Sequence, residues 1–342
     1  MFDLIPIPWH LFWAPLLLAG GLSYLLTWGA KSLAAKFGWY AYKTKHQVHD
    51  RPIARLGGVA IFLSFVMPFL IFLELTPPRI GLLLAVTIVF LMGLWDDLFN
   101  VRPWAKIVLQ VAAIAVAIAF GLHIGQVSNP FGGVIILPIF WDIFFTALWL
   151  WLVTNAMNLL DGLDGLAGGV GAIAAVTLFV LSLFTIVNQP ETAIMAIVLL
   201  GAVLGFLWWN WYPAKIFMGD SGSYTLGFLV GGLAIISGAK LATAALVLGF
   251  PLLDMLWAGF RRLRLGRHPF SADREHLHHR LLDVGIPHQG VVLITLSVVA
   301  LFAFISLLSG TKAKLALLAL VALLMVIVLR TVIFLRRRKR KS

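Results

Sequence analysis

Long apolar segments separated by short polar loops follow one another along nearly the whole chain. A helix needs about 20 apolar residues to cross a hydrocarbon core of about 30 Å, and blocks close to this length recur in the sequence. Because the apolar residues form continuous blocks, the pattern favours helices over a transmembrane β-barrel. We therefore expect an all-α polytopic integral membrane protein with about eleven transmembrane helices. The expected helices cover residues 11–34, 55–75, 80–96, 104–121, 138–155, 165–187, 192–210, 220–237, 240–260, 290–309 and 313–335.

The composition agrees with a membrane protein and excludes an ordinary soluble domain. Hydrophobic residues make up 61% of the 342 residues, and only 12% are charged, against about 25% in soluble domains. The N-terminal stretch MFDLIPIPWH lacks the basic residues that begin a signal peptide, so we expect the first apolar segment to be retained. Without cysteine, the chain cannot use disulfides, thiolate metal sites or a cysteine nucleophile. No linker interrupts the pattern, and we expect one integral membrane domain over residues 1–342.

The basic residues lie mostly in the loops that follow the odd-numbered expected helices and at the C-terminus. Cytoplasmic loops carry an excess of Lys and Arg, which places the N-terminus outside and the C-terminus in the cytosol. The tail RRRKRKS is expected to anchor the last helix and to contact anionic lipid head groups, so we expect no nucleic-acid partner. The loops of the other face hold Arg79, Lys240, Lys312 and Lys314.

Most of the acidic residues fall on the same expected cytosolic face. Asp and Glu contribute little to membrane topology, so their concentration there needs another cause. Ionisable residues at membrane segments usually serve a function. We therefore expect an active site built from the cytosolic loops at about residues 36–55, 96–106, 155–169, 210–223 and 261–290. The acidic residues of this face are Asp50, Asp96, Asp97, Asp161, Asp164, Asp220, Asp254, Asp273, Glu275 and Asp283.

Two adjacent carboxylates, Asp96 and Asp97, end one expected helix, and Lys106 lies on the first turns of the next. Two like charges at a membrane edge are unfavourable unless a cation or a proton accompanies them. A hard cation such as Mg²⁺, or a proton-transfer role for one carboxylate, would account for the pair. An ordinary charged helix end is the alternative interpretation.

The stretch NAMNLLDGLDGLAGG, residues 155–169, places four polar side chains between two apolar segments. They step by three residues, and the glycines at 162, 165, 168 and 169 indicate that the later half is a loop. Exposed backbone amides beside side-chain oxygens suit a diphosphate with Mg²⁺, which shares its coordination with substrate phosphates. Caps and turn residues would explain one or two of these side chains. They would not explain the set Asn155, Asn158, Asp161 and Asp164.

Two further clusters lie nearer the C-terminus. In GDSGS, residues 219–223, Asp220 begins an expected helix, either as a favourable cap or as another oxygen ligand. The basic loop at 261–290 contains histidines whose spacing does not match the usual zinc sites, whereas Arg and His clusters bind phosphates. A solvated basic loop would explain the arginines but not the histidines. This last cluster consists of Asp273, Arg274, His276, His278 and His279.

Together the four clusters predict a cytosolic pocket for Mg²⁺, a diphosphate-containing anion and a membrane-borne substrate, and hence phosphoryl transfer at the membrane surface. The motifs that carry them, in this order, resemble the polyprenyl-phosphate N-acetylhexosamine-1-phosphate transferase family. The chain looks closest to the bacterial undecaprenyl-phosphate GlcNAc-1-phosphate transferases of O-antigen, enterobacterial common antigen and teichoic acid initiation. The matching motifs are His49-x-x-x-x-x-Arg55-Leu-Gly57-Gly58, DDxxxxxPxxK from Asp96, NAxNxxDGxDGLA from Asn155, GDSGS from Gly219 and DREHLHHRL from Asp273.

The resemblance implies a reaction and a location. An oxygen of undecaprenyl phosphate attacks the sugar-linked phosphate of UDP-GlcNAc, which releases UMP and leaves GlcNAc-diphosphate-undecaprenol. The implied cofactor is Mg²⁺, with Mn²⁺ as an alternative. The implied location is the bacterial inner membrane, with the active site facing the cytosol. The implied partners are undecaprenyl phosphate, a UDP-N-acetylhexosamine and the lipid bilayer. The oligomeric state is open, with a homodimer as one option.

The resemblance also implies roles for single residues. Asp220 would bind the metal ion, with Asn158 as a further ligand. Asp96 and Asp97 would lie by the lipid phosphate, with Asp97 as the candidate base, and Lys106 would meet lipid or diphosphate charge. A lipid phosphate that is already dianionic could attack without a base, so Asp97 could orient it instead. The implied substrate-binding residues are Arg55, Asn155, Asp161, Asp164, Arg274, His276, His278 and His279.

Three alternatives stay open. A phospho-MurNAc-pentapeptide transferase uses the same chemistry, but typically has three consecutive histidines, so HLHH favours the GlcNAc type. Another UDP-N-acetylhexosamine could be the donor. A transporter of lipid-linked sugars would place polar groups near the middle of the bilayer, whereas here they gather on one face.

Overall fold

The computed structural model describes residues 10–37, 53–184, 187–238, 241–266 and 276–339, and within these the side chains of 278, 279, 329 and 332–339 are not described. The elements in chain order are α1 (His10–Phe37), α2 (Gly57–Phe72), α3 (Pro77–Phe99), α4 (Pro103–Ala119), β1 (Gln126–Ser128), β2 (Val134–Ile136), α5 (Ile139–Leu160), α6 (Leu166–Ser182), α7 (Pro190–Asn210), α8 (Gly219–Ile236), α9 (Leu241–Val247), α10 (Gly249–Arg264), α11 (Leu277–Val284), α12 (His288–Leu308) and α13 (Thr311–Lys339).

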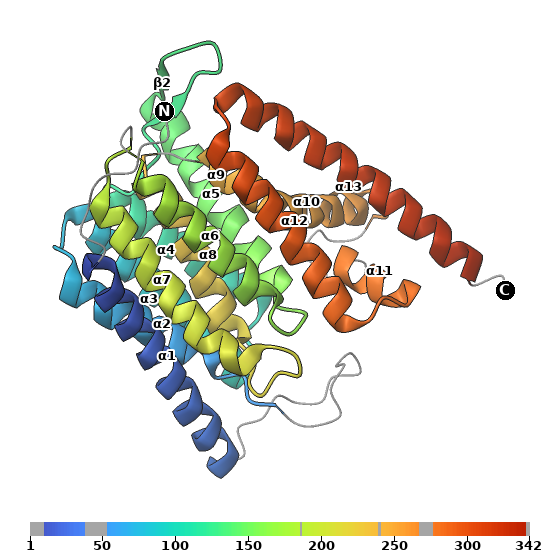
Figure 1. The fold of residues 1–342 in the computed structure, drawn as a ribbon, viewed down its shortest axis with the longest axis horizontal. Coiled ribbons are helices and arrows are strands. Elements are labelled where there is room, and N and C mark those ends of the chain that lie inside the picture. The colour runs from blue at the N-terminus through green and yellow to red at the C-terminus, as the bar shows by residue number, and fades with distance from the viewer. Residues whose placement is uncertain (1–9, 38–52, 185–186, 239–240, 267–275, 340–342) are drawn as a thin grey trace.

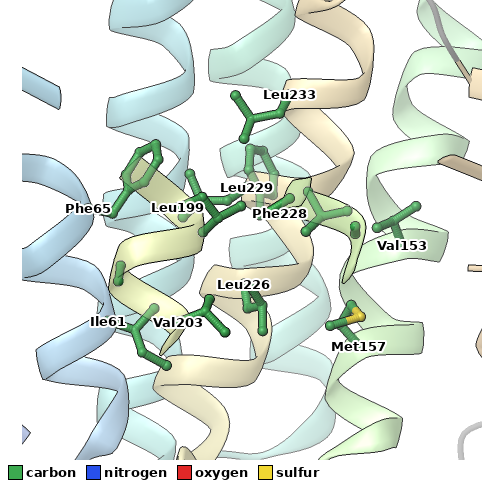
Figure 2. Close-up of a cluster of buried hydrophobic side chains, with 14 of the residues drawn as sticks. Ile61, Phe65, Val153, Met157, Leu199, Val203, Leu226, Phe228, Leu229 and Leu233 are labelled. Carbon is green, nitrogen blue, oxygen red and sulfur yellow. The ribbon is translucent and has the colours of Figure 1, made fainter. Parts of the chain in front are cut away.

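Helix α8 lies at the centre of the bundle. All of its residues except Asp220 and Ile236 are buried, and it packs against α2, α3 and α5. Its repeated glycines make this possible, because helices in lipid associate through close backbone packing more than through a hydrophobic force. The buried side chains labelled in Figure 2 belong to α2, α5, α7 and α8. They include Ile61, Phe65, Val153, Met157, Leu199, Val203, Leu226, Phe228, Leu229 and Leu233.

The other helices surround α8 or extend from it on one side. Helices α1 to α7 pack closely around the centre, whereas α10 to α13, orange to red in Figure 1, lie beside this bundle. One contiguous core joins α1 to α9 with α12. Two smaller clusters, around Leu277 and Met325 and around Leu246, Phe302 and Val321, lie apart from it. A single domain over residues 1–342 stays a prediction.

Several helices are long and apolar enough to cross a membrane. By length and composition six of the described helices qualify, α1, α3, α5, α7, α12 and α13, and α2, α4 and α6 are shorter apolar helices. Helices α9 and α10 qualify together, which makes up to seven spans if this bent pair is one. The chain is therefore a multi-pass α-helical membrane protein. The count of eleven spans and their orientation stay predictions.

Two local features differ from the sequence-based expectation. Residues 240–260, expected as one helix, are bent by 75° between α9 and α10. Gly249 and Pro251 lie in the first turn of α10, where the missing N–H of proline leaves no helical hydrogen bond unmade. The all-α expectation also misses a short antiparallel hairpin, in which Gln126 pairs with Ile136. Asp142 of α5 holds this hairpin, since its Oδ1 accepts the backbone N–H of Gly125 at 2.7 Å.

The central packing makes a prediction about Gly227 in α8. A Cβ there would lie 2.7 Å from Thr154 Cα and 2.9 Å from Thr154 O, both backbone atoms that cannot move alone. We expect Gly227→Ala to destabilise the fold by about 1–3 kcal/mol, as overpacking usually does. The measurement is the thermal unfolding midpoint of the detergent-solubilised protein.

Gly21 in α1 is the matched control, because a Cβ at that position meets no atom within 4 Å. The same Gly→Ala change should leave the midpoint unchanged or raise it slightly, since alanine favours a helix by up to about 1 kcal/mol. Equal midpoints for the two variants would show that α8 does not pack as tightly as described.

Candidate active site

The end of α3 meets the start of α8. The Asp97 carboxylate accepts the backbone N–H of Asp220 at Oδ1 (2.8 Å) and that of Ser221 at Oδ2 (3.0 Å). The Ser221 hydroxyl also donates to Asp97 Oδ2, at 2.6 Å. The first N–H groups of a helix have no partner within the helix, so a carboxylate there satisfies them and favours the positive end of the helix dipole. Asp97 thus fixes the first turn of α8, and with it Asp220.

Glycines let the neighbouring backbones come this close. A Cβ on Gly93 of α3 would lie 2.5 Å from the Ser221 Cα, and one on Gly58 of α2 would overlap the Gly222 nitrogen. The Gly58 N–H donates to Met218 O at 2.9 Å, which joins the start of α2 to the residues before α8. This junction brings the exposed Arg55, just before α2, to the side of α8.

Lys106 lies between the carboxylates of Asp96 and Asp220. Its ammonium nitrogen lies 2.7 Å from Asp96 Oδ2 and 2.8 Å from Asp220 Oδ2. Asp96 Oδ1 also accepts the Val101 N–H at 2.7 Å, which orders the turn between α3 and α4. The expectation that Asp96, Lys106 and Asp220 lie together is therefore met, although they come from three different helices.

Asn158 approaches Asp220 from α5. Its amide donates to Asp220 Oδ1 at 3.2 Å and to the Ser223 hydroxyl at 2.9 Å. Asp161 follows the last residue of α5 and is partly buried. Burial raises the pKa of Asp161 well above its ordinary value, the charges of Asp220 and Asp97 raise it further, and Arg55 opposes them. We call Asp96, Asp97, Asp161 and Asp220, with Lys106, the acid cluster.

The acid cluster fits a metal ion that is shared with a ligand, and not a cage of protein ligands. Among the described residues, no group of three or more His, Asp or Glu side chains converges closely enough to hold a metal ion. Mg²⁺ usually takes one or two carboxylates and completes its shell with water and substrate phosphates. Asp220 and the Asn158 amide oxygen supply a donor set of this kind. The position of Lys106 between Asp96 and Asp220 shows that the cluster favours a cation.

Two predicted residues have structural partners outside the acid cluster. The Asn155 amide donates to Gln110 Oε1 at 2.8 Å, which links α5 to α4. Asp164 is buried, and its Oδ2 accepts the Ala214 N–H at 2.9 Å, which orders the chain between α7 and α8. These bonds hold the walls of the site, and the substrate-binding roles of Asn155 and Asp164 stay predictions.

The loop within the glycine-rich stretch 155–169 is shorter than expected. Only residues 161–165 connect α5 and α6, and Gly165 uses a positive φ of 77°. Gly168 and Gly169 instead lie in the first turns of α6, where a Cβ would contact side chains of Leu207 and Leu296. The prediction of a loop through residue 169 was therefore wrong, because these glycines serve helix packing.

The predicted histidine cluster is described only in part. Arg274 lies outside the described residues, and so do the side chains of His278 and His279. His276 is buried just before α11, and its Nδ1 lies 3.1 Å from Asp254 Oδ2. Asp254, on α10, was counted among the cytosolic acids but not among the site residues.

Sequence reasoning also missed two polar residues that shape the site. Asn210 Oδ1 accepts the Gly165 N–H at 3.0 Å, and its amide donates to Ile216 O at 2.9 Å. His288 Nε2 accepts the Asp164 N–H at 3.0 Å. Both lie at the ends of apolar helices. There the sequence does not show whether a single polar residue connects two segments or only caps its own helix.

The chain matches proteins of known family over most of its length. Residues 79–238 match the model of glycosyl transferase family 4. Decaprenyl-phosphate N-acetylglucosaminephosphotransferase of Mycobacterium tuberculosis is 34% identical over 322 residues, covering 84% of this chain and 80% of that protein. The chain belongs to glycosyl transferase family 4. Undecaprenyl-phosphate alpha-N-acetylglucosaminyl 1-phosphate transferase of Escherichia coli is 30% identical over 295 residues, covering 82% and 79%.

These matches confirm the resemblance to the polyprenyl-phosphate N-acetylhexosamine-1-phosphate transferases. The stretch matched by the family model contains the whole acid cluster and Asn158. The roles of these residues stay predictions, since the match assigns none of them.

The raised pKa of Asp161 predicts a pH-dependent stability. The folded chain binds this proton more tightly than the unfolded chain, whose Asp pKa is about 3.9. The stabilisation is therefore complete below that value and is lost as the pH rises through the raised pKa. Without divalent cations at about pH 8, Asp161→Asn should melt a few degrees above the unaltered protein, and it should lose this part of the pH dependence.

The measurement is the thermal midpoint in detergent with a chelator between about pH 5 and 8. Glu74→Gln, an exposed carboxylate just before α3, is the matched control and should not change the midpoint. If Asp161→Asn melted below the unaltered protein at the upper end of this range, Asp161 would not be under the repulsion inferred from the structure.

Proposed function

We propose that this protein transfers N-acetylglucosamine-1-phosphate from UDP-GlcNAc to undecaprenyl phosphate at the cytosolic face of a bacterial inner membrane. An oxygen of the lipid phosphate forms a bond to the sugar-linked phosphorus of UDP-GlcNAc. The bond from that phosphorus to the oxygen of the uridine phosphate breaks, and UMP leaves with this oxygen. The product is GlcNAc-diphosphate-undecaprenol, the first lipid-linked intermediate of a cell-surface glycan.

One observation carries the proposal. Relatives that match more than four fifths of the chain are named as N-acetylglucosamine phosphotransferases that act on decaprenyl or undecaprenyl phosphate. The acid cluster supports this proposal, because a lysine and a helix N-terminus can stabilise the negative charge of the phosphates, and carboxylates can hold the metal ion that phosphoryl transfer uses. The apolar surface of the helices suits a lipid substrate that stays in the membrane.

The side chains divide this work according to their contacts. Asp220 and Asn158 would hold Mg²⁺, which when bound neutralises charge on the diphosphate oxygens. Lys106, paired with Asp96 and Asp220, supplies a positive charge that can move to a phosphate oxygen when a cation takes its place. We assign contacts with the nucleotide sugar to Arg55, which is exposed, and to Asp161.

Asp97 is assigned a positioning role. Its two carboxylate oxygens already accept three hydrogen bonds from the first turn of α8, which leaves one of about four acceptor sites for another partner. A phosphate monoester has a second pKa near 6 and is mostly dianionic at about pH 7. The lipid phosphate can therefore attack without giving a proton to Asp97. This favours the orienting role over the alternative of a general base.

The identities of the donor sugar and of the lipid chain both need a direct comparison of substrates. A MurNAc-pentapeptide or another UDP-N-acetylhexosamine could be the donor, with the same site chemistry. The mycobacterial relatives are named for decaprenyl phosphate and the enterobacterial ones for undecaprenyl phosphate. The assay below therefore varies both substrates.

The first experiment measures UMP release by the purified protein in detergent. UDP-GlcNAc and UDP-MurNAc-pentapeptide are offered in parallel, each with undecaprenyl or decaprenyl phosphate and Mg²⁺. We expect lipid-dependent UMP release from UDP-GlcNAc that a chelator abolishes. Asp220→Ala should lower kcat by at least about 100-fold, because it removes the carboxylate assigned to hold the Mg²⁺ that neutralises the reacting phosphates. Glu74→Gln should have no effect.

Each other outcome has a definite meaning. UMP release from the pentapeptide donor alone would replace the donor and keep the mechanism. Full activity of Asp220→Ala would remove the acid cluster from the mechanism. No UMP from these donors or from other UDP-N-acetylhexosamines would favour a transporter of lipid-linked sugars.

We also propose eleven spans, with the N-terminus outside and the C-terminus in the cytosol. The chain has no cysteine, so single cysteines can be placed without removing others. Ser128→Cys, exposed on the hairpin, should react with a membrane-impermeant maleimide in intact cells, or in spheroplasts where an outer membrane blocks the reagent. Leu265→Cys, exposed at the end of α10, should react only after the membrane is permeabilised. The reverse pattern would overturn the orientation.

A further inference from the structure

Two lysines from separate parts of the chain approach the same aromatic ring. Lys31 Nζ, near the end of α1, lies 5.2 Å from the centre of the Trp209 ring, and Lys215 Nζ, in the connection from α7 to α8, lies 5.5 Å from it. Each contact is favourable as a cation–π interaction, but two like charges beside one ring repel each other. In the part of the chain that the structure describes, neither ammonium pairs with a carboxylate. We call Lys31 and Lys215 the lysine pair.

The backbone holds the lysine pair in place. The Lys215 N–H donates to Trp209 O at 2.8 Å, which turns the chain back over the end of α7. Helices α1 and α7 pack side by side (Figure 1), and a Cβ on Gly205 would lie 2.3 Å from Gly20 O. The Tyr24 ring of α1 also packs on the Trp209 ring, with centroids 5.2 Å apart. The two segments therefore cannot separate freely to relieve the repulsion between the ammonium groups.

An apolar strip runs from the lysine pair along the joined faces of α1 and α7. Leu17, Tyr24 and Lys31 are spaced by seven residues, so they share one face of α1. Leu204 and Trp208 share one face of α7, and the Trp208 ring lies 6.4 Å from the Tyr24 ring. The four apolar and aromatic side chains of this strip are exposed on helices that are long and apolar enough to cross a membrane. They are therefore in a position to contact lipid.

The site combines a positive end with an apolar strip, as an anionic amphiphile requires. Tyr and Trp gather where a membrane meets water, and basic pockets between helices on the cytoplasmic side bind anionic head groups. The lysine pair lies at the same end of the bundle as the acid cluster, because Lys215 is in the connection that leads to Asp220. A free phosphate would use the lysines and leave the strip unused. A zwitterionic head group would bring a cation of its own.

We propose that Lys31 and Lys215 bind the phosphate of an anionic phospholipid whose acyl chains lie along the strip of Leu17, Tyr24, Leu204 and Trp208. The two ammonium groups donate charge-assisted hydrogen bonds to the phosphate oxygens, which supplies the negative charge that the pair lacks. This site is separate from the acid cluster. It does not depend on the proposed reaction, since it binds a lipid of the surrounding membrane and not a substrate.

The experiment is a lipid titration of the purified, delipidated protein in detergent, read by native mass spectrometry. Dioleoylphosphatidylglycerol is the anionic probe, and dioleoylphosphatidylcholine is the zwitterionic comparison. Lys31→Gln and Lys215→Gln should each weaken binding of the first phosphatidylglycerol by about 5-fold, as expected for one lysine that meets an anionic head group. The double variant should bind phosphatidylglycerol no better than phosphatidylcholine. Binding of phosphatidylcholine should not change in any variant.

Lys36→Gln is the matched control, because it removes the same charge from the same helix. Lys36 also lies beside an aromatic ring, 5.8 Å from the centre of Phe37, but it does not share the helix face of Leu17 and Lys31. It should bind phosphatidylglycerol as the unaltered protein does. Lys31→Arg keeps the charge and should do the same. An equal loss in Lys36→Gln and in Lys31→Gln would show a diffuse effect of positive charge and would overturn the site.

Melting separates a ligand site from a packing role. Without added lipid, Lys31→Gln should melt close to the unaltered protein, because it loses a ring contact and also relieves a repulsion. Phosphatidylglycerol should raise the midpoint of the unaltered protein, since a ligand stabilises the state that binds it. It should raise that of Lys31→Gln no more than phosphatidylcholine does. If the variant melted lower by the same amount with and without phosphatidylglycerol, Lys31 would serve packing alone and the proposal would fail.

Two further probes test the source of the phosphate. Glycerol phosphate in large excess should not displace phosphatidylglycerol, because it has no chain to lie on the strip, and displacement would overturn the lipid requirement. Undecaprenyl phosphate should bind Lys31→Gln and the unaltered protein equally. If only its binding were weakened in the variant, the lysine pair would belong to the substrate lipid and not to a phospholipid. Absence of UMP release by the unaltered protein would refute the proposed function and leave these measurements unaffected.

Discussion

The position of Asp220 depends on the carboxylate of Asp97. Three hydrogen bonds to Asp97 fix the first turn of α8, a helix that is buried along nearly its whole length. In an apolar surrounding, unpaired N–H groups in that turn would be strongly unfavourable, and the Asp97 side chain satisfies two of them. Gly58 and Gly93 make the contact possible, because any side chain there would separate the backbones.

The same arrangement concentrates negative charge. Lys106 of α4 pairs with Asp96 of α3 and Asp220 of α8, and Asp161 follows the end of α5. The pKa of Asp161 is raised first by burial and then by the charges of Asp220 and Asp97. Such a cluster opposes folding unless a cation accompanies it. Lys106 supplies part of that charge within the protein. A site of this kind favours ligands that bring cations with them, which is the property that a Mg²⁺-bound nucleotide diphosphate has.

A second polar unit lies where α10 meets α11, and it differs in character. The acid cluster is formed by helix ends, whereas the second unit is a buried pair, in which Asp254 Oδ2 lies 3.1 Å from His276 Nδ1. Helix α12, which follows α11, begins at His288, and His288 Nε2 accepts the N–H of Asp164 in the loop that also holds Asp161.

The amino-acid sequence by itself determined the helical membrane class, the family and the segments that carry chemistry. These properties are local: hydropathy over about 20 residues predicts a helix in lipid, and motif residues close in sequence can be recognised together. The tertiary structure alone decided which polar atoms meet. Asp97 reaches α8 across more than a hundred residues, Asn155 pairs with Gln110 instead of the acid cluster, and Asp254 joins His276. These pairings depend on how each helix is rotated and packed, and the hydropathy of a helix that is apolar on all sides does not specify that rotation.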